Sequence, residues 1–470
     1  MRYEFSSAIA LRDAITSKKL SAVDVVRNAL QRQVDCESHL NCFATRTPEL
    51  ALEAAYRADQ AIQTGQPPGA LHGLPISVKD LIAIGGVRQM FGSRSMEFNV
   101  AQTDAPAVAR IKAAGACIIG TTTTSEFGCK AVGDSPLTGI TRNPWNTDKT
   151  PGGSSCGAAA SVAAGVTPFA LGTDGGGSIR APSSLTGLFG IKAQFARVPV
   201  FPASATPTLG HVGPLARTVR DAALLLSVIA GHDPRDPFSV AGKVPDFQKA
   251  CDLPIKGMRL AWSPTLGYAK PDPEVVRITE LAVKRFESLG CEIIDLSEGI
   301  GGDPVACWMA EFYAGVGTRL NETLRTKRHL LDPAVASMLD KALDLSLLDY
   351  YSQVFVRYQF REKIRTLFNS FDLLLTPTLP VSAFDVGLDI PPQFSDRNVC
   401  SWQYYTYPFN LTGQPAASLP VGFTNDELPV GLQLVAAINQ EVDIFRAAAA
   451  FEAAFPWDGI RPPLLDRHRP

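Results

Sequence analysis

The sequence is short of the features that would point to a membrane or secreted protein. Charged side chains interrupt the first twenty residues from Arg2 to Lys19, so this stretch contains no apolar core of a signal peptide. The longest nearly apolar stretch, residues 157–172, is shorter than the roughly 18–20 residues of a membrane span and contains Pro168. We therefore expect a cytoplasmic protein with no membrane segment.

Charge is also scarce, and neither sign dominates. Charged residues make up 19% of the 470 residues, and the formal net charge is −2. An average soluble domain has about 25% charged residues. A balanced charge gives no electrostatic attraction for nucleic acid, so we expect a small, near-neutral molecule as the binding partner. The 38 Gly and 35 Pro indicate a loop-rich enzyme. A homodimer stays open.

The nine cysteines contain no Cys-x-x-Cys pair. Their odd number and scattered positions predict reduced, mostly buried thiols rather than disulfides or a cysteine metal site. We expect neither a metal nor another cofactor.

The order of apolar patterns predicts one α/β domain. Apolar residues at spacings of three and four within residues 6–63 predict helices, so residues 1–65 are expected to form an N-terminal helical segment packed on a core of residues 66–470. Short apolar runs at 74–79, 116–120 and 372–376 then alternate with amphipathic helices. This alternation predicts a single large α/β domain with helices on both faces of a central sheet.

Two turns rich in glycine and serine lie between residues 150 and 190. The first, residues 151–157, opens an alanine-rich helix; the second, residues 173–178, follows a strand and opens another helix. A helix of eight to ten residues covers about 12–15 Å, and the following strand can retrace that distance. Both turns are therefore expected at one edge of the sheet, where open α/β folds place their sites. Within the first turn, Ser154 and Ser155 look equivalent.

The second turn has the composition of an acyl-transfer site. A helix N-terminus offers unpaired N–H groups and a positive dipole end, which suits a developing oxyanion. Three consecutive glycines let the backbone approach a substrate carbonyl. This pattern predicts Ser178 as the nucleophile and the N–H groups of Gly175, Gly176 and Gly177 as oxyanion donors.

The candidate base for this serine is a lysine. None of the six histidines lies in the segment with the two turns, and we expect structural roles for His72 and His211. Lys79 ends an apolar run, where desolvation would lower its pKa and leave a neutral amine. The competing interpretation is a surface ion pair between Lys79 and Asp80.

Several long segments are similar to one known family. GLPISVKD at 73–80, PGGSSCG at 151–157, GTDGGGSIRAPSSLTGLFGIK at 172–192 and NLTGQPAASLPVG at 410–422 resemble the amidase signature family, and the resemblance extends from about Asp24 to Glu452. It implies a mixed, twisted central sheet and a Ser-cis-Ser-Lys triad. In this triad Lys79 is the base, Ser154 is the bridging serine after a cis peptide bond, and Ser178 is the nucleophile. The implied reaction is hydrolysis of a small-molecule amide through an acyl-serine.

The resemblance also suggests roles for neighbouring residues. Gly128 and Cys129 fall in the segment with which family members line the acyl pocket, so we expect them to contact substrate. Asp174 and Arg180 flank the glycine loop and are expected to hold it by hydrogen bonds. Cys156 departs from the family's glycine pair. Its place at a helix N-terminus would lower the pKa of its thiol, but no base is suggested for it, so we predict no catalytic role.

Other functions stay open or are disfavoured. Within the family, the alternatives are the glutaminase-type component of a tRNA-dependent amidotransferase and a urea, carbamate or ester hydrolase. A nucleotide-binding function for residues 172–178 is disfavoured because the chain lacks GxxxxGK[ST] and GxGxxG. A catalytically inactive binding module is disfavoured because all three triad positions are intact. The sequence does not specify the acyl group or the amine.

Overall fold

A mixed sheet of eleven strands runs through the computed structural model, which describes residues 3–463. Its strands lie in the order β1 (Phe43–Arg46), β3 (Cys117–Thr122), β2 (Pro75–Lys79), β6 (Phe169–Asp174), β8 (His211–Ala216), β7 (Phe189–Lys192), β12 (Ala416–Phe423), β13 (Pro429–Ala436), β11 (Leu373–Pro377), β9 (Arg259–Trp262) and β10 (Glu292–Asp295). The pairs β2–β3, β2–β6, β9–β11 and β9–β10 are parallel, and the other pairs are antiparallel. Strands β4 (Asp134–Ser135) and β5 (Gly139–Ile140) form a separate pair.

Helices cover both faces of this sheet. The N-terminal helices are α1 (Ala8–Thr16), α2 (Ala22–Leu40) and α3 (Pro48–Gln63); the others are α4 (Pro106–Ala113), α5 (Cys156–Ala163), α6 (Arg180–Thr186), α7 (Val219–Ile229), α8 (Phe247–Ala250), α9 (Pro273–Ser288), α10 (Val305–Thr326), α11 (Pro333–Leu343), α12 (Leu347–Leu367), α13 (Pro408–Thr412) and α14 (Glu441–Ala454). Short 3₁₀ helices are η1 (Arg94–Met96), η2 (Glu126–Gly128), η3 (Arg328–Leu330) and η4 (Pro392–Phe394). No helix within residues 3–463 is long and apolar enough to cross a bilayer.

Two large hydrophobic clusters fill the space between sheet and helices. One contains residues of α4, α7, α9 and α14, and the other contains residues of α10 to α13. Along β11, Leu373 and Leu375 pack into the first cluster and Leu374 into the second, because successive side chains of a strand point to opposite faces. The predicted single α/β domain, with a mixed sheet covered on both faces, is confirmed.

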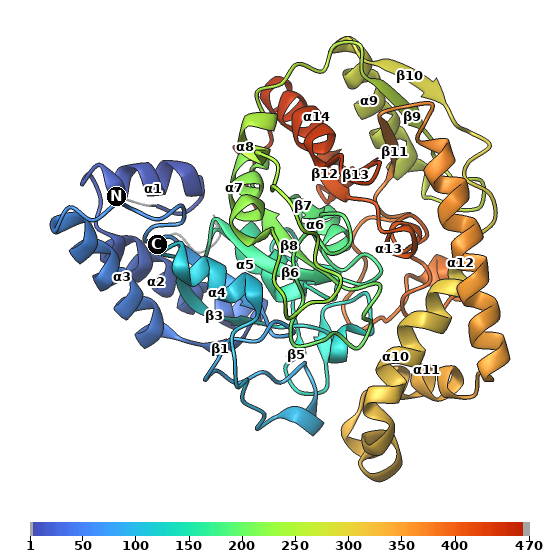
Figure 1. The fold of residues 1–470 in the computed structure, drawn as a ribbon, viewed down its shortest axis with the longest axis horizontal. Helices are drawn as coiled ribbons and strands as arrows, with labels where there is room; N and C mark the ends of the chain where they lie inside the picture. Colours follow the sequence, from blue (N-terminus) through green and yellow to red (C-terminus); the bar gives the residue numbers. More distant parts are fainter. Residues whose placement is uncertain (1–2, 464–470) are drawn as a thin grey trace.

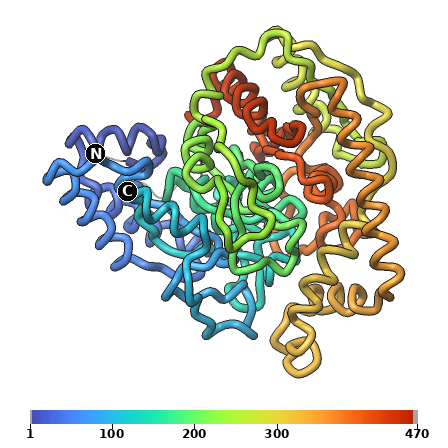
Figure 2. Tube along the Cα trace, in the orientation of Figure 1, coloured from blue at the N-terminus to red at the C-terminus, as the bar shows by residue number. Residues whose placement is uncertain are grey.

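The N-terminal segment does more than pack helices on the core. Strand β1, between α2 and α3, pairs antiparallel with β3 and forms one edge of the central sheet. Helices therefore describe only part of residues 1–65, and the segment completes the sheet. In Figure 1 these elements lie on the left, opposite α10, α11 and α12 on the right. Figure 2 shows the chain from about 150 to 220 between these two ends.

Candidate active site

Parallel strands bring the two glycine- and serine-rich turns together. Strands β2 and β6 pair in parallel, with Ser77 opposite Ala170 and Val78 opposite Leu171. Their carboxyl ends, Lys79 and Asp174, therefore lie at the same edge of the sheet. The first turn reaches this edge just before α5, and the N–H of Ser155 donates to the carbonyl of Ser178 over 3.3 Å. The sheet edge predicted from the sequence is the one observed.

Lys79 lies at the centre of a set of hydroxyl groups. Its Nζ lies 2.7 Å from Ser154 Oγ, 3.0 Å from Ser155 Oγ and 2.8 Å from Thr173 Oγ1. The side chain is fully buried, and in the described chain no carboxylate lies within ion-pair distance of its amine. Burial lowers the pKa of Lys79 from 10.5 to about 7, although Cys156 and Asp174 act in the opposite direction. A large fraction of this lysine is therefore neutral at neutral pH.

The alternative of a surface ion pair between Lys79 and Asp80 does not hold. Asp80 is buried, and both of its carboxylate oxygens accept from the N–H of Met90. Burial raises the pKa of Asp80 to about 7. The carboxylate thus holds the backbone near Phe91, which lines the cavity described below.

The structure distinguishes the two serines that look equivalent in the sequence. The peptide bond between Gly153 and Ser154 is cis, as the resemblance implies. Ser154 contacts Lys79 on one side and lines a cavity on the other. Ser155 Oγ instead donates to the carbonyl of Thr173 over 3.1 Å and is absent from the cavity wall. Of the two serines, Ser154 is the one that can connect the lysine with a molecule in the cavity.

Ser178 lies at the start of the turn into α6 and lines the same cavity as Ser154. It is half-buried, and its Oγ makes no hydrogen bond to another part of residues 3–463. This hydroxyl is therefore accessible to a molecule in the cavity.

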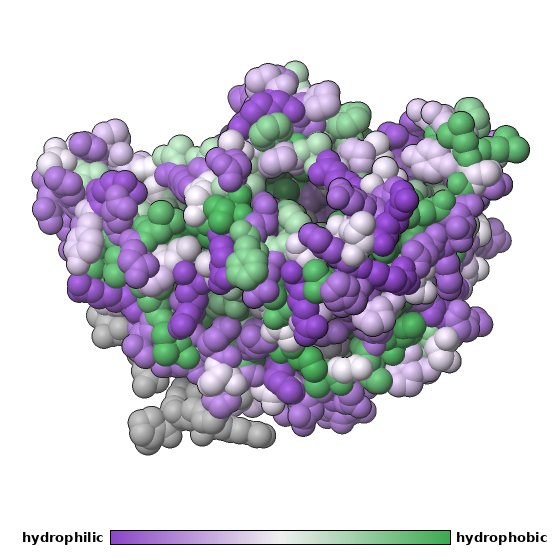
Figure 3. All heavy atoms as spheres, turned by 90° about the horizontal axis from the view of Figure 1, so that it is seen from below, coloured by the Kyte–Doolittle hydropathy of each residue, from purple (hydrophilic) through white to green (hydrophobic). Residues whose placement is uncertain are grey.

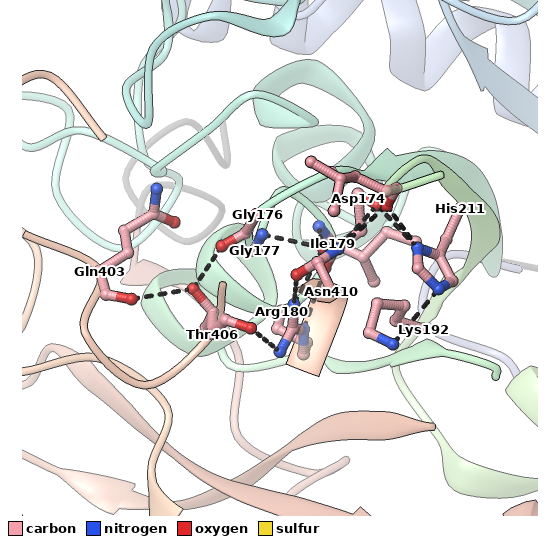
Figure 4. Close-up of polar contacts among 12 residues, drawn as sticks. Asp174, Gly176, Gly177, Ile179, Arg180, Lys192, His211, Gln403, Thr406 and Asn410 are labelled. Carbon is pink, nitrogen blue, oxygen red and sulfur yellow. Dashed lines mark hydrogen bonds and ion pairs between the residues drawn. The ribbon is translucent and has the colours of Figure 1, made fainter. Parts of the chain in front are cut away.

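A buried ionic network supports the glycine loop from behind, as Figure 4 shows. Arg180 donates from Nε and NH2 to the two oxygens of Asp174, over 3.0 and 2.9 Å, and both side chains are fully buried. Arg180 also donates to the side chains of Asn410 and Gln433 and to the carbonyl of Thr406. Arg180 keeps the pKa of Asp174 well below its usual range despite burial. The hydrogen bonds expected of Asp174 and Arg180 are thus present.

This network changes the set of oxyanion donors expected from the sequence. The N–H of Gly177 donates to Asp174 Oδ1 over 2.8 Å, so it is already paired. The N–H groups of Gly175, Gly176 and Ser178 have no acceptor in the part of the chain that the structure describes. The free donors are therefore those of Gly175, Gly176 and Ser178.

Gly128 and Cys129 occupy different environments. Gly128 lines the cavity, and a Cβ added there would lie 3.2 Å from Ser154 Oγ. Cys129 is fully buried and does not reach the cavity; its carbonyl accepts from Tyr313 Oη over 3.1 Å and from Cys400 Sγ over 3.2 Å. The structure therefore places Gly128 alone of the two where it can contact substrate.

Cys156 corrects an electrostatic expectation. Its position at the start of α5 was expected to lower the pKa of the thiol, but complete burial raises it instead. The Sγ donates to the carbonyl of Thr123 over 3.3 Å. The thiol is therefore protonated at neutral pH.

The two histidines singled out in the sequence do not contact the candidate nucleophile. His72 Nε2 lies 3.0 Å from the carbonyl of Ala58. His211 lines the cavity, but its ring nitrogens face the carbonyl of Leu209, 2.8 Å away, and the amine of Lys192, 3.4 Å away. Burial lowers the pKa of His211 well below its usual value, so the ring is neutral.

The cavity has a volume of about 410 Å³ and a largely apolar wall. Leu81, Phe91, Phe127, Val200, Phe201, Phe312, Val316 and Leu320 contribute side chains to it. Its charged lining residues are Asp174, which is paired with Arg180, and the exposed Arg319. Residues 3–463 contain no group of three or more His, Cys, Asp or Glu side chains that could hold a metal ion. The face of the molecule in Figure 3 shows polar and apolar residues interspersed.

Sequence reasoning missed three residues that contact the reactive groups or the glycine loop. Thr173 contacts Lys79 and precedes Asp174 in the recognised motif, so its position was a usable signal. Trp308 and Thr406 contact the carbonyls of Gly175 and Gly176. Both lie in the segment after residue 300, which carries no local signal of this contact.

Comparisons with known proteins agree with this arrangement. A family model described as Amidase matches residues 24–445. The acylamidase of Rhodococcus erythropolis is 32% identical over 97% of both chains. The GatA-type chain of the glutamyl-tRNA(Gln) amidotransferase of Geobacter metallireducens is 35% identical over 95% of this chain and 96% of that protein.

Solved structures are similar over the whole chain. A bacterial aryl acylamidase of the amidase signature family superposes with a TM-score of 0.93 at 28% identity and covers 100% of both chains. A 6-aminohexanoate cyclic dimer hydrolase with bound substrate superposes with a TM-score of 0.90 at 26% identity, over 98% of this chain and 99% of that one.

Proposed function

This chain belongs to the amidase family and is a hydrolase of amide C–N bonds, and from that premise we propose that it cleaves small, largely apolar carboxylic amides through an acyl-Ser178 intermediate. One observation carries the proposal. A buried lysine without a carboxylate partner in the described chain lies 2.7 Å from Ser154 Oγ, and Ser154 shares a cavity with the accessible Ser178. This is the arrangement of a base, a proton relay and a nucleophile.

In the first half-reaction, the neutral amine of Lys79 takes the proton of Ser154 as Ser154 takes the proton of Ser178. Ser178 Oγ then bonds to the amide carbon, and the carbonyl electron pair moves to oxygen. The free N–H groups of Gly175, Gly176 and Ser178 can stabilise this oxyanion. When the intermediate collapses, the C–N bond breaks, and the proton returns through Ser154 to the leaving nitrogen.

In the second half-reaction, water replaces the amine. Lys79 takes a proton from water through Ser154, the hydroxide oxygen bonds to the acyl carbon, and the bond to Ser178 breaks. The proton then returns to Ser178, and the carboxylic acid leaves. A pKa near 7 suits both directions, because the lysine must accept and then donate a proton near neutral pH.

The cavity favours an apolar amide over glutamine. Free glutamine carries an ammonium and a carboxylate group that need charged or strongly polar partners in a buried site. Asp174 is the acidic residue of the cavity wall, and its carboxylate is fully engaged by Arg180, Asn410 and the loop N–H groups. Within the described chain, Arg319 is the only permanent cation on that wall, and it is exposed. The wall therefore suits an uncharged acyl or aryl group, as the names of the acylamidase relatives also suggest.

The proposal is tested with the purified chain alone, without any partner protein, on matched amides, ureas, carbamates and esters and on glutamine. We expect turnover of apolar amides, with Ser178→Ala and Lys79→Ala each reducing kcat by at least about 10³-fold. Ser155→Ala is the matched control and should cost far less than Ser154→Ala. Near-wild-type turnover by Ser178→Ala or Lys79→Ala would reject the mechanism. Faster hydrolysis of glutamine than of apolar amides would reject the substrate class alone.

A further inference from the structure

Three consecutive carbonyls of the glycine loop are each held by a donor from the far end of the chain. The carbonyl of Asp174 accepts from Asn410 Nδ2 over 3.1 Å, that of Gly175 from Trp308 Nε1 over 2.9 Å, and that of Gly176 from Thr406 Oγ1 over 2.6 Å. Figure 4 shows Asn410 and Thr406 beside the loop. These donors lie more than 130 residues from the loop in sequence.

Holding a carbonyl also sets the direction of the next N–H. In a planar trans peptide unit, the C=O and N–H bonds point to opposite sides. The N–H of Gly177 shares a peptide unit with the carbonyl of Gly176 and is already bound by Asp174. The N–H of Gly176 shares a unit with the carbonyl of Gly175 and has no acceptor within the described chain. Trp308 therefore controls the direction of a free donor.

Trp308 is well placed to hold that direction. Its side chain is 1% exposed, and its ring stacks between Phe312 and Tyr407, with centroids 4.9 and 5.3 Å away and interplanar angles of 30° and 21°. Tyr407 is fixed in turn, because its Oη donates to Asp303 over 2.6 Å. A Cβ added at Gly176 would lie 2.5 Å from Trp308 Cζ2, so the ring lies directly against the loop.

The same helix connects this contact with the cavity. Trp308, Phe312, Val316 and Leu320 follow one another at intervals of four along α10, and the last three line the cavity. Side chains at this spacing share one face of a helix. The hydrogen bond from the indole also polarises the peptide unit and thereby strengthens its N–H as a donor.

We propose that Trp308 is a positioning residue for acyl transfer: by holding the carbonyl of Gly175, its indole N–H aims the N–H of Gly176 at the oxygen on which negative charge develops. This inference rests on the proposed function of Ser178 as nucleophile. Trp308 touches neither the substrate nor the reacting atoms, and it acts through the peptide unit between Gly175 and Gly176.

The test removes the indole N–H and keeps an aromatic ring, with Trp308→Phe. Tyr313→Phe is the matched control, because it removes a buried hydrogen bond from the same aromatic cluster, to the carbonyl of Cys129 rather than Gly175. We expect Trp308→Phe to lower kcat for an apolar anilide by about 10- to 100-fold, less than the roughly 10²–10³-fold of a deleted oxyanion donor. KM should stay within about threefold, and Tyr313→Phe should keep kcat within about twofold.

Two further readouts distinguish positioning from a general structural defect. An arylboronic acid forms a tetrahedral adduct on Ser178, and its inhibition constant should rise by about the same factor as kcat falls. The dissociation constant of the uncleaved anilide, measured with Ser178→Ala carrying Trp308→Phe, should match that of Ser178→Ala alone. The midpoint of the pH profile of kcat/KM should not move, because Lys79 is untouched.

Unchanged kcat in Trp308→Phe would overturn the inference, and so would an equal loss in Tyr313→Phe or an unchanged boronate inhibition constant. If Trp308→Phe does not fold, site-specific incorporation of 3-benzothienylalanine at position 308 replaces the N–H by sulfur in an isosteric ring and carries the same expectations. Full activity of Ser178→Ala would instead refute the proposed function. The two failures are therefore distinguishable.

Discussion

The dependence of kcat/KM on pH is expected to follow one ionisation with a midpoint near 7, because only neutral Lys79 can accept the proton of Ser154. Burial lowers the pKa of this lysine from 10.5 to about 7. A lysine with its ordinary pKa would be neutral in only about one molecule in 3,000 at pH 7. The lowered pKa corresponds to about 5 kcal/mol against the charged form, since one pH unit equals about 1.36 kcal/mol.

The sign of the effect follows from the protonation state. Below pH 7 Lys79 is increasingly protonated, so kcat/KM should fall about tenfold per pH unit, and above about pH 8 it should reach a plateau. The profile is measured from about pH 5.5 to about pH 9.5 with an uncharged amide substrate, so that the substrate contributes no ionisation.

A carboxylate placed beside the amine should move this midpoint. Thr173 Oγ1 lies 2.8 Å from Lys79 Nζ, so Thr173→Asp adds a negative charge there. A unit charge at about 4 Å favours the ammonium form by about 4 kcal/mol at an effective dielectric constant of about 20. Thr173 is half-buried and faces the cavity, so water weakens the effect, and we expect a midpoint about 1–2 pH units higher. Thr173→Val removes the hydroxyl without adding charge and should leave the midpoint within about half a unit.

Two buried carboxyl groups could produce a similar profile and need their own controls. Burial raises the pKa of Asp80 and of Glu126 to about 7 in each case. If Lys79 is the titrating group, the midpoint persists in Asp80→Asn and Glu126→Gln. Loss of the ionisation in either variant would refute the assignment. A wild-type midpoint above about 9 would refute the lowered pKa of Lys79 itself.

Three further predictions concern other residues. Cys156→Ala should keep kcat within about threefold, because the buried thiol is protonated and bound to Thr123; a loss like that of Ser178→Ala would contradict this. Gly128→Ala should lower kcat at least about tenfold, because its Cβ would lie 3.0 Å from Leu81 and 3.2 Å from Ser154 Oγ. Gly86→Ala is its control, with a similar positive φ of 80° and nothing within 4 Å; equal losses in kcat would contradict the steric explanation. Burial raises the pKa of Glu452 from 4.5 to about 8, so its contribution to stability is present below pH 4.5 and lost as pH rises through 8. Denaturant unfolding of Glu452→Gln should therefore lose on the order of 3 kcal/mol of pH dependence over this window, and an unchanged pH dependence would contradict it.

Much of the architecture could be predicted because its causes are local. The apolar runs at 74–79 and 372–376 became β2 and β11 with ends within one residue, since alternation and length are properties of the segment itself. The glycine turns before α5 and α6 are local in the same way. Strand β1 was missed because it is a four-residue strand between two helices, and its partner in the sheet, β3, is distant in sequence.

The candidate site divides along the same line. Ser178 and its glycines could be predicted, because a nucleophile at a helix N-terminus is a feature of one short segment. Gly177 was wrongly included among the free donors, although an Asp three residues earlier is a known competitor for a backbone N–H. The choice between Ser154 and Ser155 came from family resemblance, and only the contacts with Lys79, Thr173 and the cavity give it a physical reason.

The sequence by itself therefore determined the order of strands and helices, the two turns and the candidate nucleophile. The tertiary structure alone decided the neutral state of Lys79, the pairing of Asp174 with Arg180 and the contact of Trp308 with Gly175. The physical reason is that desolvation and hydrogen bonding depend on which distant segments surround a group. Residues 308 and 406 approach the loop at 175–178 only after the sheet has formed, and no local pattern records that approach.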